Sequence, residues 1–402
     1  MKKMISLLLC ALMVLALTVP ALAADDFKVG AVLVGDENEP YTLAHMEGIR
    51  KALANLGLTE EANLVWKFAI PENEKCLDAI EDCIDQGCSV VFTNSYGHQD
   101  YAQQAAENYP EVQIISMTGD KARALGYDNF GNAFTRIYEA RYVSGIVAGM
   151  KVKELVEAGK LTDANYKDGK VRIGYVGAYP YAEVISGFTA FFLGIQSVYP
   201  DVTMDVLYTS SWFDITAEKA AAEQLIGTGC VIIGQHADST GAPSACEAAL
   251  NAGTTVFSVG YNIDMLTAAP NAALVSPTNE WGVYYTYAIG TAKDGGSIAT
   301  NWIEGFAQDA VAVTTLGPNC AAGTQEAVDA AIAGLKDGSL KVFNTDTFTV
   351  GGAKMESCFA TDTNGDWVPD ADEAVWDGEY HESYFQSAPA FATIIDGITP
   401  LN

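Results

Sequence analysis

The chain has 402 residues, and 51 acidic residues against 22 basic ones give a formal net charge of -29 at pH 7. A balance this negative repels phosphate backbones and anionic lipid surfaces, so it excludes nucleic acid as a natural partner. A chain of this length also exceeds what one hydrophobic core usually holds, which predicts two domains of roughly 150 to 200 residues each.

The first 24 residues have the layout of a secretory signal peptide. Two lysines precede an apolar run over 4–19, and the small-residue motif ALA at 21–23 predicts cleavage near Ala24. Cleavage would leave 51 acidic and 20 basic residues. No later stretch reaches the roughly 20 apolar residues that a membrane-spanning helix requires. We therefore expect an exported protein, periplasmic or on the outer face of the cytoplasmic membrane, without direct membrane insertion.

Seven cysteines remain after the predicted cleavage, and an odd count argues against a complete disulfide framework. Seven in a chain of this size is also far below the density of disulfide-stapled domains. The spacing of Cys76, Cys83 and Cys88 matches no common zinc pattern. We expect mostly buried free thiols, with no more than one or two bridges.

Short apolar, β-branched runs alternate with longer amphipathic runs up to about residue 300, which is typical of parallel sheets wrapped by helices. The predicted fold class is α/β, with two lobes that each contain a parallel sheet flanked by helices. The expected strands are 27–35, 64–70, 89–95 and 112–118 in the first lobe and 171–178, 204–209, 230–236 and 254–260 in the second.

Apolar side chains recur at helical spacing over 135–153, so we expect a helix there that passes from one lobe to the other. The C-terminal tail has a weaker pattern, with a short strand candidate over 340–343. The expected division is 25–140 plus about 278–310 for the first lobe, 141–277 plus part of the tail for the second, and 311–402 for segments that brace the hinge and lobes.

Aromatic rings and short polar side chains follow nearly every predicted strand. Ligands of open parallel sheets bind beyond the carboxyl ends of the strands. Rings there can stack on a flat heteroaromatic ligand, at about 0.5 to 1.5 kcal/mol per aromatic pair, while Asn and Asp read its rim. Helix capping or core packing is an equal alternative for any single residue, and recurrence at six strand ends weakens it. The candidate ligand-binding residues are Tyr41, Asn94, Ser95, Tyr96, Tyr179, Trp212, Phe213, Asp238, Asn262, Asp264 and Trp281.

Seven segments in one order carry a resemblance: NSYGHQDY at 94–101, NFGNAFTRIYEARYVSGIVAG at 129–149, IGYVGAYPYAEVISGFTAFFLG at 173–194, SSWFD at 210–214, GQHADS at 234–239, GYNIDM at 260–265 and NEWGVYY at 279–285. They resemble the basic membrane protein family of ABC-transporter substrate-binding proteins, which includes purine-nucleoside receptors. The resemblance covers roughly 27–300. It implies a type I periplasmic-binding fold whose lobes close on a purine base or nucleoside and deliver it to an ABC permease and its ATPase.

The resemblance also implies roles for single residues. Tyr41 falls where the family places a first stacking ring, and Trp212, with Phe213 beside it, falls near the second. The family's glycine-rich opening after the first strand is replaced here by residues 36–40, Asp-Glu-Asn-Glu-Pro. The positions implied for base-edge contacts and for the opposite wall are Asn94, Ser95, Asp238 and the loop 260–264.

One departure from the family bears on the ligand. Nucleoside-binding relatives hold ribose hydroxyls with an Asp after Gly-Tyr and a Lys near the following strand, whereas this chain has Asn262 and no Lys nearby. A charge-assisted grip on a sugar is therefore missing, although Asn262 and Asp264 could still make single contacts. This favours a free base such as adenine over a nucleoside, with an unrelated small ligand as a further alternative.

Catalysis is not expected. The sequence has no nucleophile elbow, zinc-protease helix, phosphate-binding loop or dinucleotide fingerprint. His236, Asp238 and Ser239 lie too close in sequence to form a nucleophile relay. A nucleoside-cleaving enzyme is the remote alternative. A second alternative is a receptor that reports the ligand to a signalling partner, because the same closing motion serves either partner.

One acidic segment imitates a calcium-binding loop. Its oxygen-bearing side chains occupy loop positions 1, 3, 5, 9 and 12, while Trp367 stands where such loops need glycine. A plain polar turn is favoured, with a structural calcium ion as the alternative and no other cofactor. The candidate ligands are Asp362, Asn364, Asp366, Asp370 and Glu373.

Overall fold

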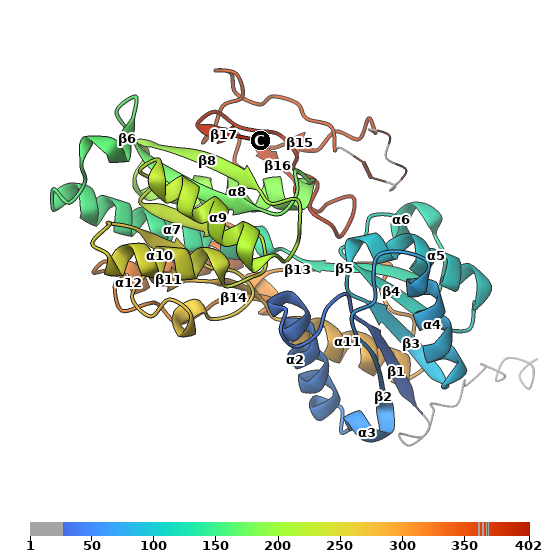
Figure 1. Ribbon diagram of the computed structural model, residues 1–402. Helices are drawn as coiled ribbons and strands as arrows, with labels where there is room; N and C mark the ends of the chain where they lie inside the picture. Colours follow the sequence, from blue (N-terminus) through green and yellow to red (C-terminus); the bar gives the residue numbers. More distant parts are fainter. Residues whose placement is uncertain (1–26, 361, 364–365, 367, 369) are drawn as a thin grey trace, which may run out of the picture.

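The protein is described from a computed structural model that defines residues 27–360, 362–363, 366, 368 and 370–402. The predicted signal peptide lies outside the described residues. Figure 1 shows two lobes, each a sheet flanked by helices, with the C-terminal segment in red running over the second lobe toward the first. The predicted α/β, two-lobed fold is confirmed.

The first lobe contains a six-stranded parallel sheet in the order β13-β5-β4-β3-β1-β2. Its inner strands are buried on both faces, which explains their continuous apolar sequences. The strands are β1 Lys28–Val32, β2 Leu64–Lys67, β3 Cys88–Thr93, β4 Gln113–Met117, β5 Phe130–Thr135 and β13 Asn301–Glu304. The helices are α2 Pro40–Asn55, α3 Glu60–Asn63, η1 Tyr96–His98, α4 Lys75–Asp85, α5 Gln99–Asn108, α6 Ala122–Leu125 and α11 Trp281–Lys293.

The second lobe repeats the plan with the order β11-β10-β9-β7-β8-β17, and β6 forms a hairpin with β7. Its strands are β6 Tyr166–Lys167, β7 Lys170–Gly177, β8 Val202–Tyr208, β9 Ile232–Gln235, β10 Phe257–Val259, β11 Ala273–Val275 and β17 Ile398–Pro400. The helices are α7 Ile137–Glu157, η2 Asp163–Asn165, α8 Ala182–Val198, α9 Ile215–Gly227, α10 Gly241–Asn251, η3 Met265–Thr267 and α12 Thr324–Asp337. The eight strands expected from the sequence are all present.

The chain crosses between the lobes three times, and the crossings are bonded to one another. They follow β5, precede α11 and follow β13, and β12 (Pro277–Asn279) pairs there with β14 (Val311–Val313) beside η4 (Phe306–Gln308). The Thr135 hydroxyl donates to Asn279 Oδ1 (2.5 Å), and the amide of Phe306 donates to the Glu139 carboxylate (2.8 Å). The three connecting segments of the hinge are therefore hydrogen-bonded to one another.

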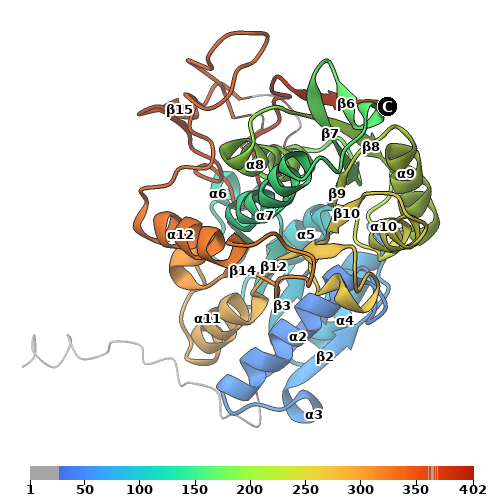
Figure 2. The same ribbon diagram turned by 90° about the vertical axis from the view of Figure 1, so that its left-hand side faces the viewer.

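Helix α7 lies wholly in the second lobe, which corrects the prediction that it passes between the lobes. It begins one residue after the crossing and packs along α8, with which it lies side by side in Figure 2. The two backbones approach closely because glycines face each other: a Cβ added to Gly145 would lie 2.1 Å from the Phe191 carbonyl, and one added to Gly194 would lie 2.1 Å from the Tyr142 carbonyl.

The C-terminal segment contacts both lobes and has little regular structure. It includes a short hairpin of β15 (Val375–Trp376) and β16 (Glu379–Tyr380). The amide of Ala388 donates to the Gly119 carbonyl of the first lobe (3.1 Å), while β17 extends the sheet of the second lobe beside β8. The strand predicted over 340–343 is wrong, since those residues form no strand and Phe343 instead stacks on Phe391.

Burial of Glu382 in this segment gives stability a pH dependence. Its carboxylate oxygens accept the amides of Ala390 (3.1 Å) and Phe391 (2.8 Å), and desolvation raises its pKa to about 7. The folded state then holds the proton more tightly than the unfolded state. The stabilisation is complete below pH 4.5 and is lost as the pH rises through 7.

The substitution Glu382→Gln replaces the carboxyl with an amide of similar shape that stays neutral at every pH. Between pH 5 and pH 8 we expect its free energy of unfolding to gain on the order of 2 kcal/mol relative to the unmodified protein, measured by urea denaturation. The exposed Glu326 of α12 provides a matched control, Glu326→Gln, which should show no such gain. Parallel pH profiles for Glu382→Gln and the unmodified protein would contradict the assignment.

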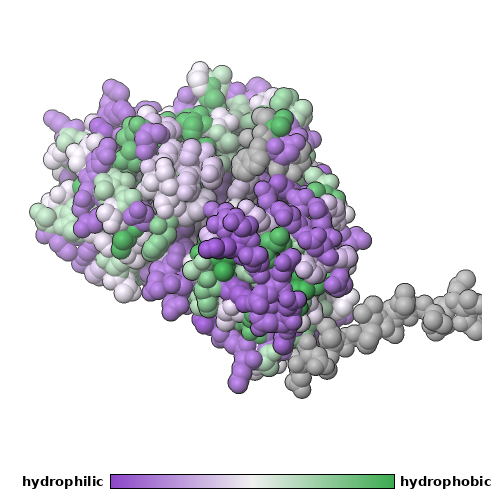
Figure 3. Space-filling view, turned by 45° about the vertical axis from the view of Figure 1, so that its right-hand side comes forward, coloured by the Kyte–Doolittle hydropathy of each residue, from purple (hydrophilic) through white to green (hydrophobic). Residues whose placement is uncertain are grey.

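The described cysteines form no disulfide bond. All seven are free thiols, and five of them are buried. No helix within the described ranges is long and apolar enough to cross a membrane. Figure 3 shows a largely hydrophilic face on the first lobe.

The predicted calcium loop lies partly outside the described residues, because Asn364 is not among them. Glu373 accepts the amides of Cys358 and Val375 (both 2.9 Å), and Asp370 Oδ2 accepts both the amide and the hydroxyl of Thr363. Among the residues that are described, no three His, Cys, Asp or Glu side chains are grouped so that they could hold a metal ion. The structural calcium ion stays an untested alternative to a plain polar turn.

Candidate functional site

A cavity of about 380 Å³ lies between the lobes, beyond the carboxyl ends of the strands in both sheets. This is the edge where open parallel sheets bind ligands, because several loops converge there. From the first lobe it is lined by Val34, Gly35, Asp36, Asn38, Glu39, Tyr41, Ala69, Asn94, Ser95, Tyr96 and Thr118. From the second lobe it is lined by Tyr179, Glu183, Ser211, Trp212, Phe213, His236, Asp238 and Tyr261.

Eight of the eleven predicted site residues line this cavity: Tyr41, Asn94, Ser95, Tyr96, Tyr179, Trp212, Phe213 and Asp238. The other three do not. Asn262 is buried behind Asp238, Asp264 is exposed and caps η3 through the amide of Leu266, and Trp281 is buried in the first lobe with its ring stacked on His45 at 4.3 Å. Trp281 thus supports α2, the helix that begins with Tyr41 in its first turn.

Tyr41 is held in place from two sides. Its hydroxyl donates to the Asn94 carbonyl (2.7 Å), and its ring packs edge-on against His45 with centroids 4.5 Å apart. Glu39 caps α2 by accepting the amides of Tyr41 (3.1 Å) and Thr42 (3.0 Å). A ring fixed in this way loses little conformational entropy when a ligand stacks on it.

The second lobe presents a group of three rings, of which Tyr179 and Trp212 line the cavity. Tyr179 and Tyr181 stack at 5.0 Å with an interplanar angle of 11°, and Trp212 meets Tyr179 at 5.2 Å and 64°. The Trp212 carbonyl accepts the amide of Asp238 (2.8 Å), which joins the loop after β8 to the loop after β9. Phe213 is 40% exposed and lies at the rim.

The first-lobe polar residues are engaged within the protein. Asn94 is fully buried, its Oδ1 accepts the amide of Val34 (2.8 Å), and its Nδ2 donates to the Thr42 hydroxyl (3.3 Å). The Ser95 hydroxyl donates to Glu72 (2.6 Å). These bonds fix the loops after β1 and β3. At least some of the hydrogen bonds that Asn94 can make therefore hold the cavity wall together.

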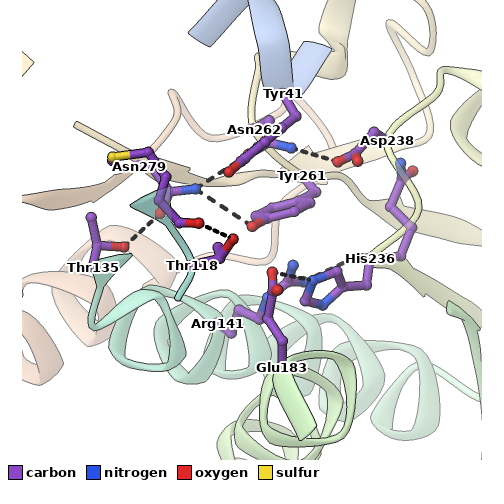
Figure 4. A network of polar contacts seen from close by, with 12 residues as sticks. Tyr41, Thr118, Thr135, Arg141, Glu183, His236, Asp238, Tyr261, Asn262 and Asn279 are labelled. Atoms are coloured by element: carbon purple, nitrogen blue, oxygen red, sulfur yellow. Dashed lines mark hydrogen bonds and ion pairs between the residues drawn. The ribbon is translucent and has the colours of Figure 1, made fainter. Parts of the chain in front are cut away.

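Asp238 is 5% exposed and faces the cavity. Desolvation, followed by the nearby carboxyls of Glu39, Glu218 and Glu183, raises its pKa well above the usual value. Its Oδ1 accepts Asn262 Nδ2 (2.7 Å), and Asn262 Oδ1 in turn accepts Asn279 Nδ2 from the hinge (3.3 Å; Figure 4). Both ends of the Asn262 amide are therefore bonded within the protein.

A buried group under the cavity was not predicted from the sequence. Glu183 in the first turn of α8 lies 3.2 Å from His236 Nε2, and Arg141 of α7 lies 3.8 Å from the centre of the Tyr261 ring (Figure 4). Burial raises the pKa of Glu183 to about 7 and lowers that of His236. The sequence placed Arg141 and Glu183 in family-like segments, but no local pattern singled them out.

Backbone strain also gathers at the cavity. Ala69 and Thr118 line it with φ angles of 53° and 58°, and Ser210 and Asn262, beside the lining residues Ser211 and Tyr261, have φ angles of 57° and 65°. Left-handed backbone at a non-glycine residue costs on the order of 1–3 kcal/mol and is typical of ligand sites and switch regions. No local sequence pattern marks Ala69 or Thr118.

The cavity wall is acidic. Asp36, Glu39, Glu183 and Asp238 line it, and no Lys or Arg belongs to the described lining. An anionic ligand such as a nucleotide would therefore contact carboxyls and no cation of the described lining, while the Arg141 guanidinium lies beneath the Tyr261 ring. The arrangement suits an uncharged or cationic ligand with a flat apolar face and N–H donors on its edge.

The chain is similar to known proteins in sequence and in structure. It is 31% identical over 274 residues to a purine-binding protein of Brucella abortus, covering 68% of this chain and 71% of that protein. It is 33% identical over 230 residues to a Haloferax volcanii protein whose name assigns it provisionally to glucose binding in an ABC transporter, covering 57% of this chain and 52% of that protein.

An ABC-transporter solute-binding protein from Aeropyrum pernix superposes with a TM-score of 0.65 at 17% identity, covering 79% of this chain and 93% of that one. A transcriptional activator of the comK gene from Bacillus halodurans superposes at 0.60 with 18% identity, covering 78% and 99%. These likenesses show the fold.

The family model for PnrA-like ABC-transporter substrate-binding proteins matches residues 28–334, which is most of the chain and includes every residue of the inter-lobe cavity. Solute-binding proteins of such transporters act outside the cytoplasm. The chain belongs to the Bmp family of ABC-transporter substrate-binding proteins.

Proposed function

We propose that this protein binds a purine between its lobes, preferring the free base to the nucleoside, and delivers it to an ABC permease outside the cytoplasm. The observation that carries the proposal is the cavity itself. It places the fixed ring of Tyr41 on one lobe and the ring of Trp212 on the other, around a wall of carboxyls that lacks Lys and Arg among the described lining residues. The similarity to a purine-binding protein supports the same ligand class.

The preference for a free base rests on Asn262. Its amide is bonded to Asp238 and Asn279, it lies outside the cavity lining, and no cation stands near it in the lining to grip sugar hydroxyls. A ribose held by Asn262 would have to break these buried bonds, and a buried polar group left unpaired costs about 1–3 kcal/mol. A free base avoids this cost.

A thermal-shift screen tests the ligand class. Protein freed of co-purified ligand is heated with free purines, nucleosides, pyrimidines, glucose and amino acids, because a ligand that binds only the folded state raises the melting temperature. We expect a shift with adenine, hypoxanthine, guanine or xanthine that exceeds the shift with the corresponding nucleoside. A shift with glucose alone, or with no purine, would overturn the proposal.

We propose that binding is reversible and leaves the ligand unchanged. His236, the one histidine in the described cavity lining, faces Glu183 rather than a nucleophile. Chromatography of an adenosine solution after prolonged incubation with the protein should recover adenosine alone. Free adenine and ribose in that solution, in amounts that scale with protein, would instead support the nucleoside-cleaving alternative.

A further inference from the structure

The segment 382–392 builds the wall of a second cavity, of about 250 Å³, beside the first. The family model matches residues 28–334, so this wall lies outside the matched residues. The segment contributes Gln386, Ala388, Pro389, Ala390 and Ala392. Asp120 of the first lobe and Tyr181 of the second lobe complete much of the remaining wall.

The segment is fastened to the first lobe at this point. The Ser387 hydroxyl and the Ala388 amide both donate to the Gly119 carbonyl, at 2.8 and 3.1 Å, and Arg123 Nη1 donates to the Phe385 carbonyl (3.4 Å). The guanidinium of Arg123 also lies 5.4 Å from the centre of the Phe385 ring. The wall is therefore a bonded part of the fold, beside the cleft.

The two cavities adjoin. Tyr96, Glu183 and Trp212 line both of them, so a group that projects past Trp212 from the first cavity enters the second. The Tyr96 hydroxyl donates to Asp120 Oδ2 (2.5 Å), which orients the carboxyl at the far side of this boundary. A ligand held between the stacking rings can thus extend into the space under the C-terminal segment.

The wall of the second cavity contains an unpaired acceptor that is itself buried. Gln386 is 4% exposed, it lines the cavity, and its Oε1 has no hydrogen-bond partner in the described structure. An unpaired buried acceptor is destabilising, so a ligand donor that reaches it would be stabilising. The carboxyls of Asp120, Glu183 and Asp362 also line this cavity, and no Lys or Arg belongs to the described lining. The remaining wall is made largely of alanines, Pro389 and aromatic rings.

We propose that this second cavity is a subsite for a short substituent on the bound purine, uncharged or cationic and ending in an O–H or N–H donor that bonds to Gln386 Oε1. The assignment rests on the proposed function, since the purine ring would occupy the first cavity. It widens the ligand class from bare bases to bases that carry a hydroxyalkyl or aminoalkyl group. The apolar wall accommodates the alkyl part, and Gln386 reads its end.

Matched ligands test the subsite. Titration calorimetry compares adenine, its 6-N-ethyl and 9-ethyl derivatives, and the corresponding hydroxyethyl derivatives, which differ only in the terminal donor. For at least one point of attachment, we expect the hydroxyethyl ligand to bind about fivefold or more tightly than the ethyl ligand. The variant Gln386→Leu should remove that preference and leave adenine affinity within twofold, because Gln386 does not line the first cavity.

A second variant guards against a folding defect in Gln386→Leu. The half-buried Ala392 lines only the second of these cavities, and Ala392→Leu would fill it. This variant should weaken the hydroxyethyl ligand at least fivefold while adenine affinity is retained. Equal affinity for ethyl and hydroxyethyl ligands at both attachment points, or a preference that survives Gln386→Leu, would overturn the subsite. Loss of adenine binding in the unmodified protein would instead overturn the proposed function.

Discussion

Replacing Trp212 with alanine is expected to weaken purine binding at least tenfold. The half-buried indole lines the cavity opposite the first lobe and packs against Tyr179. Truncation removes a stacking partner and the apolar area that the ligand would cover, and a loss of about 1.4 kcal/mol is already a factor of ten. Titration calorimetry with adenine measures the effect.

Two controls separate stacking from a general defect. Trp212→Phe keeps an aromatic face and should recover much of the affinity. Trp66 of β2 lies outside the cavity, so Trp66→Ala should leave the dissociation constant within twofold of the unmodified value. Unchanged affinity in Trp212→Ala would remove the indole from the site and with it the stacking arrangement proposed here.

Replacing Asp238 with alanine is expected to weaken purine binding roughly tenfold to a hundredfold. The substitution removes the buried carboxyl that faces the ligand and also leaves Asn262 Nδ2 without its acceptor. A buried polar group left without a partner costs about 1–3 kcal/mol. In this variant both the ligand edge and Asn262 lose a hydrogen-bond partner. Calorimetry and thermal unfolding separate the loss of affinity from the loss of stability.

Asp238→Asn resolves how the carboxyl acts. Burial and three neighbouring carboxyls raise the Asp238 pKa, so the group can hold a proton and donate it to a ring nitrogen. An asparagine amide can replace a protonated acid that donates to the ligand, but it cannot replace a carboxylate that accepts from the ligand. Retained affinity would therefore indicate that Asp238 donates, and a large loss would indicate that it accepts. Asp264→Ala, at an exposed cap outside the cavity, is the matched control. Asp238→Ala with unchanged affinity would contradict a ligand contact.

Local sequence pattern predicted the strands whose sequences are continuously apolar and β-branched, such as β3 and β4. The strands it missed include β5, whose sequence FGNAFT contains Gly131 and the buried Asn132, and the edge strands β13 and β17. Asn132 is tolerated because its amide accepts the Ala122 backbone N–H and donates to the Ser116 carbonyl. The edge strands join their sheets from distant parts of the chain, and a local pattern carries no information on such pairing.

Part of the site was also predictable from local sequence pattern. Rings and polar groups at strand ends point to the edge where the cavity lies, which is why eight predicted residues line it. The sequence could not show that Trp281 turns into the core against His45, or that the amides of Asn94 and Asn262 are bonded within the protein. Glu183 and the second cavity depend on contacts between distant segments, and these emerge only in the folded structure.

Titration calorimetry of the unmodified protein with adenine tests the central claim most directly, once co-purified ligand has been removed by unfolding and refolding. The account predicts saturable binding of one adenine per chain, with tighter binding than adenosine under the same conditions. Absence of binding by every free purine and nucleoside, with the refolded protein shown to be native by its cooperative unfolding, would contradict purine capture in the inter-lobe cavity.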